Sequence, residues 1–409
     1  MVSNQCSVDS CQKISNHKSL ILNHQSKKNL IMRIKISILY FLFSIFYLIG
    51  CKKETELSKT IKAENQTEFA TGFELYDYSD FKLLKIKNSS PESDKSETYI
   101  LHKNNFQIPD SLNKHKSVII PIQNIIVTST THIPSLEMLE VDNSLIGFPG
   151  LDYISSEKIR SLIDEEKIRE VGQNERINTE IVVDLNPDVL VSFAINESNQ
   201  TLENLKNAGI KVLLNGDWNE KHPLGKAEWI KFFGALYDKD QKAKEIFNSI
   251  KSDFESAKEL ALRTTEKPTV ITGNIYENVW YLPKGDSWSA VFLADANTDY
   301  FWKNTSGTGS LALSFEEVFD TAQNADFWIG AGNYSSLDEM KKANPHYKEF
   351  KAFKNGNVYS FSTKKGAKGG VVYYELAPNR PDLVLKDIIK ITHPELLENY
   401  ELQFFEKLK

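Results

Sequence analysis

A long helical stretch divides this chain into two parts of similar pattern. From Ala243 to Ala261, apolar residues recur at three- and four-residue spacing, and Asp238 stands where a helix cap is expected. A helix over 239–263 would be roughly 37 Å long, which is more than one small lobe needs. The stretch therefore predicts two lobes joined by one long, rigid helix.

Short apolar strands alternate with helices on both sides of that stretch. Val189–Phe193 has the composition of a buried strand in the first part, and Phe327–Gly330 has it in the second. Such alternation is typical of parallel sheets covered by helices. We therefore expect an α/β fold of two Rossmann-like lobes with central parallel sheets. The expected segments are an N-lobe at 117–236, a bridging helix at 237–265 and a C-lobe at 266–409.

Residues 70–116 differ from both lobes. Apolar and polar side chains nearly alternate in 73–78 and 81–86, and a turn-rich stretch at 88–93 precedes another strand-like run at 96–101. This pattern predicts a small β-hairpin or meander ahead of the N-lobe.

The stretch from Met32 to Cys51 has the features of a secretory signal. Arg33 and Lys35 are followed by an apolar run over 36–49, and Gly50 precedes the cysteine. A cysteine at the cut site resembles the lipobox of bacterial lipoproteins, which implies that Cys51 is lipidated. The alternative is a transmembrane anchor, but the run is 14 residues long, and a spanning helix needs about 20.

The signal divides the N-terminal region into three expected segments. We expect residues 1–31 to be a non-native leader, 32–50 to be the signal peptide and 51–69 to be a polar tether. We expect the protein to be extracytoplasmic and attached to a bacterial membrane by its lipid. The other cysteines, Cys6 and Cys11, fall in the leader, so no internal disulfide is expected after Cys51.

Charge argues against nucleic-acid binding. Of 49 basic and 55 acidic residues, six basic and one acidic precede Cys51, so residues 51–409 carry 43 basic against 54 acidic residues. A phosphate backbone requires a basic face, which this balance does not favour.

Arginine is also scarce after Cys51, so a strongly anionic ligand would lack bidentate partners. We therefore expect a less anionic ligand.

Several short motifs resemble one family of binding proteins. These are Asn178–Glu180 with Leu185–Val191, Leu202–Leu213, Thr128–His132, Gly147–Asp152, Leu313–Glu316, Tyr373–Glu375 and His393–Leu397. They are similar to the substrate-binding proteins of ABC importers for iron–siderophore complexes, haem and cobalamin, and to a lipid-anchored subset of Bacteroidetes type. The resemblance covers 117–409 and implies two lobes bridged by one rigid helix.

The resemblance implies a role for one glutamate on each lobe. Glu180 and Glu316 fall at the positions where this family presents a carboxylate to an arginine of the dimeric permease. Charges at an interface rim supply orientation and register more than affinity. The alternative is that both are ordinary first-turn glutamates that favour the helix dipole.

The ligand is expected in the cleft, at loops that leave the carboxyl ends of the strands. Aromatic residues are dense in those loops, and their flat faces suit a catecholate, a tetrapyrrole or a corrin. The candidate cleft residues are Tyr153, Trp218, Trp280, Trp302, Tyr374 and Arg380. Each aromatic residue could instead pack in a core, and Arg380 could instead open a helix before Pro381.

Metal and catalytic motifs are missing from the sequence. The histidines show no zinc-ligand spacing, and Tyr373–Glu375, expected on a strand, would point to opposite faces instead of chelating together. We expect no enzyme activity, no resident cofactor and no structural metal.

The expected function is capture of an iron complex, of siderophore or haem type, and its delivery to an ABC permease dimer with a cytoplasmic ATPase. The protein is expected to be a monomer. Alternatives are a cobalamin receptor of the same class, and an extracytoplasmic structural or adhesive lipoprotein or enzyme on the same scaffold.

Overall fold

The computed structural model describes residues 63–409 except 79, 88–95, 174–175 and 194–198. The leader, the signal peptide, Cys51 and most of the tether lie outside the described residues. Within the described part of the chain, no helix is long and apolar enough to cross a membrane.

The N-lobe contains a five-stranded parallel sheet of order β11-β10-β5-β6-β7. Its strands are β5 (Ile125–Val127), β6 (Leu145–Phe148), β7 (Arg169–Glu170), β10 (Val189–Phe193) and β11 (Val212–Asn215). The connecting helices are α2 (Ile133–Met138), α3 (Glu157–Asp164), α4 (Thr179–Leu185) and α5 (Gln200–Asn207). Every residue of β5 and all but the last of β10 are buried, as expected for strands covered on both faces.

The C-lobe has a second five-stranded sheet, of order β15-β12-β17-β18-β19. The strands are β12 (Thr269–Ile271), β15 (Asp299–Tyr300), β17 (Phe327–Ile329), β18 (Val358–Ser360) and the antiparallel edge strand β19 (Glu406–Lys407). A three-stranded antiparallel sheet adds β13 (Asn274–Tyr276), β14 (Val279–Pro283) and β16 (Ser310–Leu313). The helices are α9 (Trp288–Asp295), α10 (Phe315–Ala322), α11 (Leu337–Ala343), α12 (Lys351–Lys354), α13 (Val372–Leu376) and α14 (Pro381–Thr392).

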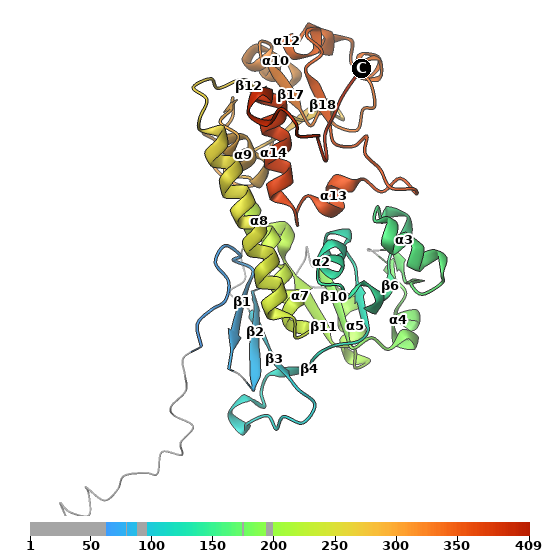
Figure 1. The fold of residues 1–409 in the computed structure, drawn as a ribbon. Coiled ribbons are helices and arrows are strands. Elements are labelled where there is room, and N and C mark those ends of the chain that lie inside the picture. Colours follow the sequence, from blue (N-terminus) through green and yellow to red (C-terminus); the bar gives the residue numbers. More distant parts are fainter. Residues whose placement is uncertain (1–62, 79, 88–95, 174–175, 194–198) are drawn as a thin grey trace, which may run out of the picture. The chain divides into compact units, whose positions relative to one another are not determined.

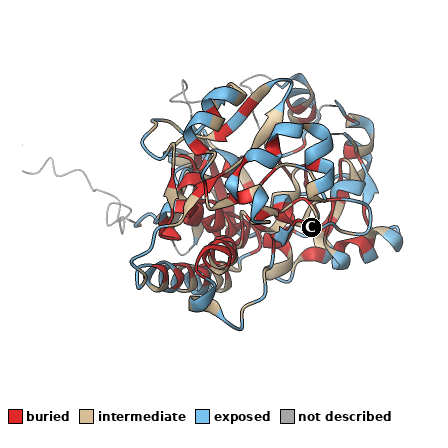
Figure 2. Ribbon diagram, turned by 90° about the horizontal axis from the view of Figure 1, so that it is seen from above, coloured by how far each residue is buried: buried red, intermediate tan, exposed pale blue. Residues whose placement is uncertain are grey.

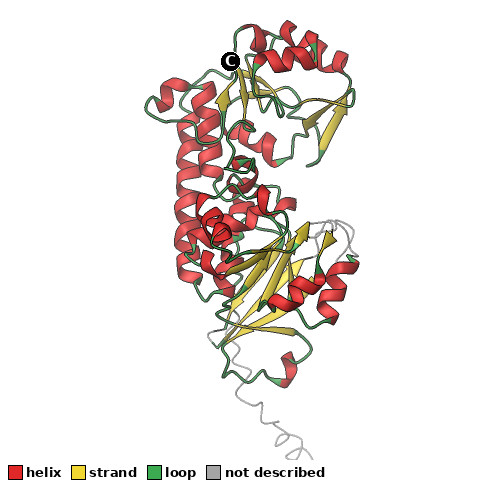
Figure 3. Ribbon diagram, turned by 90° about the vertical axis from the view of Figure 1, so that its right-hand side faces the viewer, coloured by secondary structure: helices red, strands yellow, loops and turns green. Residues whose placement is uncertain are grey.

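The long helix α8 (Asp240–Ala261) runs alongside both lobes (Figures 1 and 3). Its 22 residues give a length of about 33 Å. It packs on α6 (Pro223–Glu228) and α7 (Ile230–Leu236) of the N-lobe and on α14 near its other end. Phe247, Ile250 and Phe254 form part of its buried face. The expected two-lobed α/β fold with one bridging helix is therefore confirmed.

One apolar core is continuous from the small N-terminal sheet to α14, and a second core fills the outer part of the C-lobe. Figure 2 shows the buried residues gathered inside the elements and the exposed ones on the outer helix faces. Because the first core includes residues of both lobes and of α8, bending the lobes apart would expose apolar surface. The packing thus favours a rigid scaffold.

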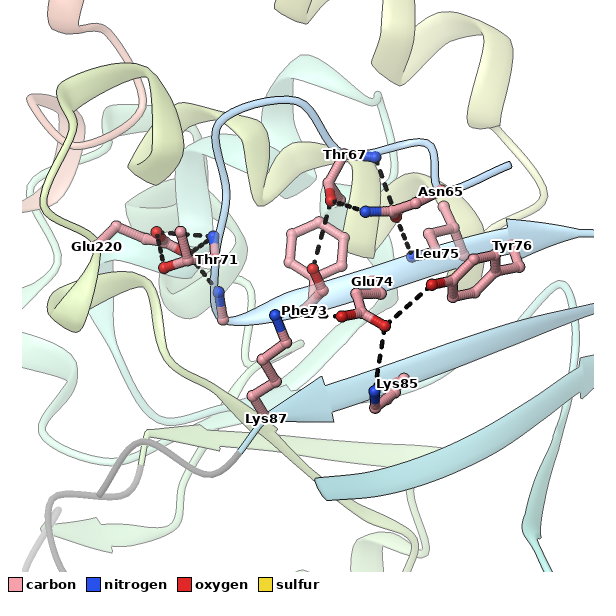
Figure 4. Close-up of polar contacts among 11 residues, drawn as sticks. Asn65, Thr67, Thr71, Phe73, Glu74, Leu75, Tyr76, Lys85, Lys87 and Glu220 are labelled. Carbon is pink, nitrogen blue, oxygen red and sulfur yellow. Dashed lines mark hydrogen bonds and ion pairs between the residues drawn. The ribbon is translucent and has the colours of Figure 1, made fainter. Parts of the chain in front are cut away.

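The small sheet extends further along the chain than expected. β1 (Phe73–Asp77), β2 (Phe81–Lys87) and β3 (Ser96–His102) form an antiparallel meander. Glu74 accepts hydrogen bonds from Tyr76 and Lys85 on its surface (Figure 4). The strand β4 (Lys116–Ile119), expected to open the N-lobe, pairs in parallel with β3 instead.

The end of the expected tether is packed onto the N-lobe. The buried carboxylate of Glu228 accepts hydrogen bonds from the backbone N–H groups of Glu68, Phe69 and Ala70 at 2.8, 2.6 and 2.7 Å. Glu220 accepts the N–H groups of Thr71 and Gly72 (Figure 4). The expected boundary at residue 69 therefore falls inside an ordered strap, residues 64–72.

Tyr373–Glu375 lie on a short helix, α13, and not on a strand. The sequence Val371-Val-Tyr-Tyr favours a strand by propensity, but contacts across the lobes override it. Glu375 is buried, and its carboxylate receives two backbone N–H groups from the N-lobe. Tyr373 and Glu375 are both buried, whereas Tyr374 between them is exposed.

Candidate ligand-binding cleft

A cavity of about 790 Å³ opens at the carboxyl ends of the N-lobe strands. Its N-lobe wall consists of the segments after β5, β6 and β11 and the end of β10. The opposite wall comes from α9 and from the segment around α13. The lining includes Thr130, Thr131, Phe148, Tyr153, Phe193, Asp217, Trp218, Lys226, Trp288, Tyr373 and Tyr374. The cavity thus lies where parallel α/β sheets commonly bind ligands.

Three of the six candidate cleft residues line this cavity together. Tyr153, Trp218 and Tyr374 have exposed fractions of 70%, 44% and 52%. Large aromatic side chains left this open inside a concave surface have unburied faces available for a partner.

The other three candidates do not line the cavity. Trp280 is fully buried in the C-lobe core, where it stacks on Trp328 and donates its indole N–H to the Thr272 carbonyl at 3.0 Å. Trp302 is partly buried and packs against Tyr300 and Phe301. A position after a strand does not distinguish an aromatic residue that turns into the core from one that faces a cleft.

Arg380 also interacts with another residue of the protein. Its guanidinium makes two hydrogen bonds, at 2.9 and 2.7 Å, to the buried carboxylate of Asp382. Hydrogen bonding to the Asp382 carboxylate raises the pKa of Arg380, so the guanidinium stays protonated. This bidentate pair holds the guanidinium at the start of α14, and Arg380 is not among the residues that line the cavity.

The lining residues that are not candidates include Lys226 and Trp288. Lys226 is buried, and its Nζ donates hydrogen bonds to the carbonyls of Asp217 at 2.8 Å and Trp218 at 3.0 Å. The same ammonium lies 5.1 Å from the centre of the Trp288 ring. Burial lowers the pKa of Lys226, and the nearby Asp217 and Glu220 oppose that shift. Nothing in the local pattern of α6 marks this lysine as a buried one.

Asp217 is held firmly in the same wall. Its carboxylate accepts a hydrogen bond from the Thr131 hydroxyl at 2.7 Å, and its backbone N–H donates to the Asn215 side chain at 2.9 Å. Among the described residues that line this cavity, Asp217 and Lys226 are the only charged ones. The lining therefore combines aromatic faces with one carboxylate and one ammonium.

The segment that carries α13 joins the two sides of the cleft. The Asn379 side chain accepts from Ser135 at 2.8 Å and donates to the Thr131 carbonyl at 2.7 Å. A Cβ at Gly370 would lie 2.1 Å from the Tyr153 carbonyl oxygen, so only glycine permits this approach. These contacts fix the position of Tyr374 relative to the N-lobe.

Glu180 and Glu316 occupy equivalent places on α4 and α10. Each is an exposed residue in the first turn of its helix. Neither forms a salt bridge within the described residues, which leaves both carboxylates available to a partner. No cluster of three or more metal-ligating side chains occurs in the described part of the chain.

Comparisons with known proteins agree with this architecture. The model of a periplasmic binding protein family matches residues 125–364, from β5 to beyond β18. An uncharacterized lipoprotein of Methanocaldococcus jannaschii is 30% identical over 301 residues, which are 71% of this chain and 70% of the relative.

Solved structures that share the fold include two proteins named for their ligands. The periplasmic haem-binding protein HutB of Vibrio cholerae has a TM-score of 0.51 at 17% identity, covering 64% of this chain and 99% of its own. The triscatecholate siderophore-binding protein FeuA of Bacillus subtilis, complexed with ferri-bacillibactin, has a TM-score of 0.50 at 18% identity, with coverage of 67% and 94%. The family match spans both parallel sheets and α8, and the chain therefore belongs to the periplasmic binding protein family.

Proposed function

We propose that this protein is the substrate-binding component of an ABC importer, and that it captures an iron complex of siderophore or haem type. The observation that carries the proposal is the 790 Å³ cavity at the strand ends, with Tyr153, Trp218 and Tyr374 exposed in its walls. Its size suits a ligand much larger than a bare ion. Two proteins of the same fold are named for haem and for a triscatecholate siderophore, which supports this ligand class.

Attachment to a membrane through Cys51 is part of the proposal. The sequence around Cys51 supports it, as does the lipoprotein name of the Methanocaldococcus jannaschii relative. A tethered receptor would stay at high effective concentration near its permease. Labelling with a radioactive fatty acid would test this step, since Cys51→Ser should abolish incorporation of the label.

Delivery to the permease would use Glu180 and Glu316. Their exposure and their matching positions on α4 and α10 support a docking role. The permease dimer is expected to present an arginine to each carboxylate.

Fluorescence titration of the full chain tests ligand capture directly. Trp218 and Trp288 line the cavity, so an iron chelate or haem bound there should quench their emission. The titrants are ferric enterobactin, haem and cyanocobalamin. We expect quenching by at least one of the two iron complexes, and Trp218→Phe should remove a large part of it. Quenching by cyanocobalamin alone would favour the cobalamin alternative, and no response to any titrant would contradict the proposal.

A further inference from the structure

A second cavity, of about 540 Å³, lies in the C-lobe side of the cleft. Its walls include the turn after β12, the start of α9 and the beginning of β16. Trp288, Tyr373 and Tyr374 line both this cavity and the first one. These three aromatic side chains therefore form a boundary that both cavities share. One ligand bound against them can occupy both cavities.

The two cavities differ in charge. The first contains Lys226 and Asp217, whereas the described residues that line the second include no Asp, Glu, Lys, Arg or His. The polar side chains of the second cavity are hydroxyls and amides. Those of Ser289, Ser310 and Asn333 make no hydrogen bond within the described part of the chain, so they are available to a ligand.

Glycine residues contribute bare backbone to the same wall. Gly332 has φ +83, and a Cβ there would lie 2.5 Å from the Asn274 side chain. Gly273 has φ +71, and a Cβ there would lie 2.1 Å from the Tyr281 carbonyl oxygen. Only glycine fits both positions, so this part of the wall consists of peptide groups, which are polar and uncharged.

Desolvation decides which ligand groups suit this cavity. A charged group would lose hydration there without meeting an opposite charge, which is unfavourable. A hydroxyl or an amide can exchange its water for the free hydroxyl and amide groups of the wall at little net cost. The second cavity therefore favours ligand groups that are polar but uncharged.

We infer that the second cavity binds an uncharged, hydroxyl- or amide-bearing part of the same ligand whose aromatic or metal-chelating part occupies the first cavity. The inference rests on the proposed function and makes it more specific. Ser289, Ser310 and Asn333, on the C-lobe side of the shared aromatic boundary, would then determine which organic part of a ligand is accepted.

The test compares two ferric complexes of similar size and different charge. Ferrichrome is an uncharged trihydroxamate on a cyclic peptide, and ferric enterobactin carries three negative charges. Both are titrated against the full chain as wild type, as Ser310→Lys and as Ala312→Lys. Ser310 lines the second cavity, whereas Ala312 lies on the same strand outside both cavities, and both side chains are exposed. Each site can thus accept a lysine without disturbing a core.

We expect wild type to bind ferrichrome more tightly than ferric enterobactin. Ser310→Lys should shift the ratio of the two Kd values about tenfold towards the anionic complex, and Ala312→Lys should leave the ratio unchanged. An unchanged ratio in Ser310→Lys, tighter binding of ferric enterobactin by wild type, or binding of haem alone would overturn the inference while the proposed function stands. If ferrichrome, ferric enterobactin, haem and cyanocobalamin all fail to bind, the proposed function fails, and this inference fails with it.

Discussion

The carboxylate of Glu375 on α13 lies 2.7 Å from the backbone nitrogen of Ser155 and accepts its N–H across the cleft. Its second oxygen accepts the N–H of Ser156, the N-cap of α3, at 3.0 Å. Burial raises the pKa of Glu375 to about 7, and the neighbouring Glu137 adds to the shift, while the two N–H groups oppose it. The contact between α13 and the N-lobe therefore contains a group that titrates near neutral pH.

This raised pKa predicts a pH-dependent stability. Between about pH 4.5 and 7 the folded protein holds a proton on Glu375 that the unfolded chain releases. The contribution of Glu375 to the free energy of unfolding should therefore fall by about 3 kcal/mol as pH rises through this window, and level off above it. Buried His132, whose pKa is lowered to about 4 by desolvation, contributes a change of opposite sign between about pH 4 and 6.5. Urea unfolding at several pH values would measure the slope.

Substitution of Glu375 isolates its contribution to that slope. Glu375→Gln is neutral at every pH, so the unfolding free energy of wild type should fall by about 3 kcal/mol relative to that of the variant as pH rises from about 4.5 to 7. The matched control is Glu259→Gln, an exposed position on α8 that should keep the wild-type slope. A slope in Glu375→Gln equal to that of wild type would contradict the assignment.

The sequence predicts the scaffold better than it predicts the cleft. The spacing of Phe247, Ile250 and Phe254 predicts α8 because burial of one face repeats along a long helix. Trp218 and Trp280 both follow or lie in strands, yet one faces the cleft and the other is in the core. The direction of such a side chain depends on contacts between segments distant in the sequence, and local periodicity does not encode them.

Lys226 and α13 illustrate the same limit. The buried Lys226 is stabilised by two carbonyls of the preceding loop, which accept hydrogen bonds from its ammonium, and its neighbours in the sequence do not reveal this. The residues of α13 favour a strand by propensity, and the N–H groups of Ser155 and Ser156 stabilise a helix by binding Glu375. In contrast, the loops expected to line the N-lobe wall do so, because strand ends of a parallel sheet meet at one edge.

Lys226 is expected to position the Trp218 loop for ligand binding. Lys226→Met keeps the length of the side chain but removes the hydrogen bonds to the carbonyls of Asp217 and Trp218. Loss of hydrogen bonds from a charged donor predicts about 2 kcal/mol lower unfolding free energy and roughly tenfold weaker binding of a quenching titrant. Urea unfolding and fluorescence titration would measure both. Lys221→Met, at an exposed position nearby, should change neither value, and wild-type affinity in Lys226→Met would refute the positioning role.

Glu228 is expected to hold the strap, residues 64–72, on the N-lobe. Besides its three backbone partners it pairs with Lys231 at 2.6 Å, and it is fully buried. Glu228→Gln leaves the Lys231 ammonium without its partner charge, so the unfolding free energy should fall by about 3–5 kcal/mol. Limited proteolysis should also cut within 64–72 sooner than in wild type. Equal cleavage rates in the variant and in wild type would show that the strap is held by other contacts.

Reversing the charges of Glu180 and Glu316 should separate transport from ligand binding. Both carboxylates are exposed and lie outside the cavity that carries the proposed site. The double variant Glu180→Lys with Glu316→Lys should therefore keep the wild-type Kd for its iron complex in solution. Uptake of that complex by cells that express the cognate permease should fall at least about tenfold, because two like charges would face the permease arginines. The control, Glu259→Lys with Glu401→Lys, makes the same charge change at two other exposed positions. Equal loss of uptake in both double variants would indicate a general effect of net charge, and full uptake by the first would exclude docking through these two glutamates.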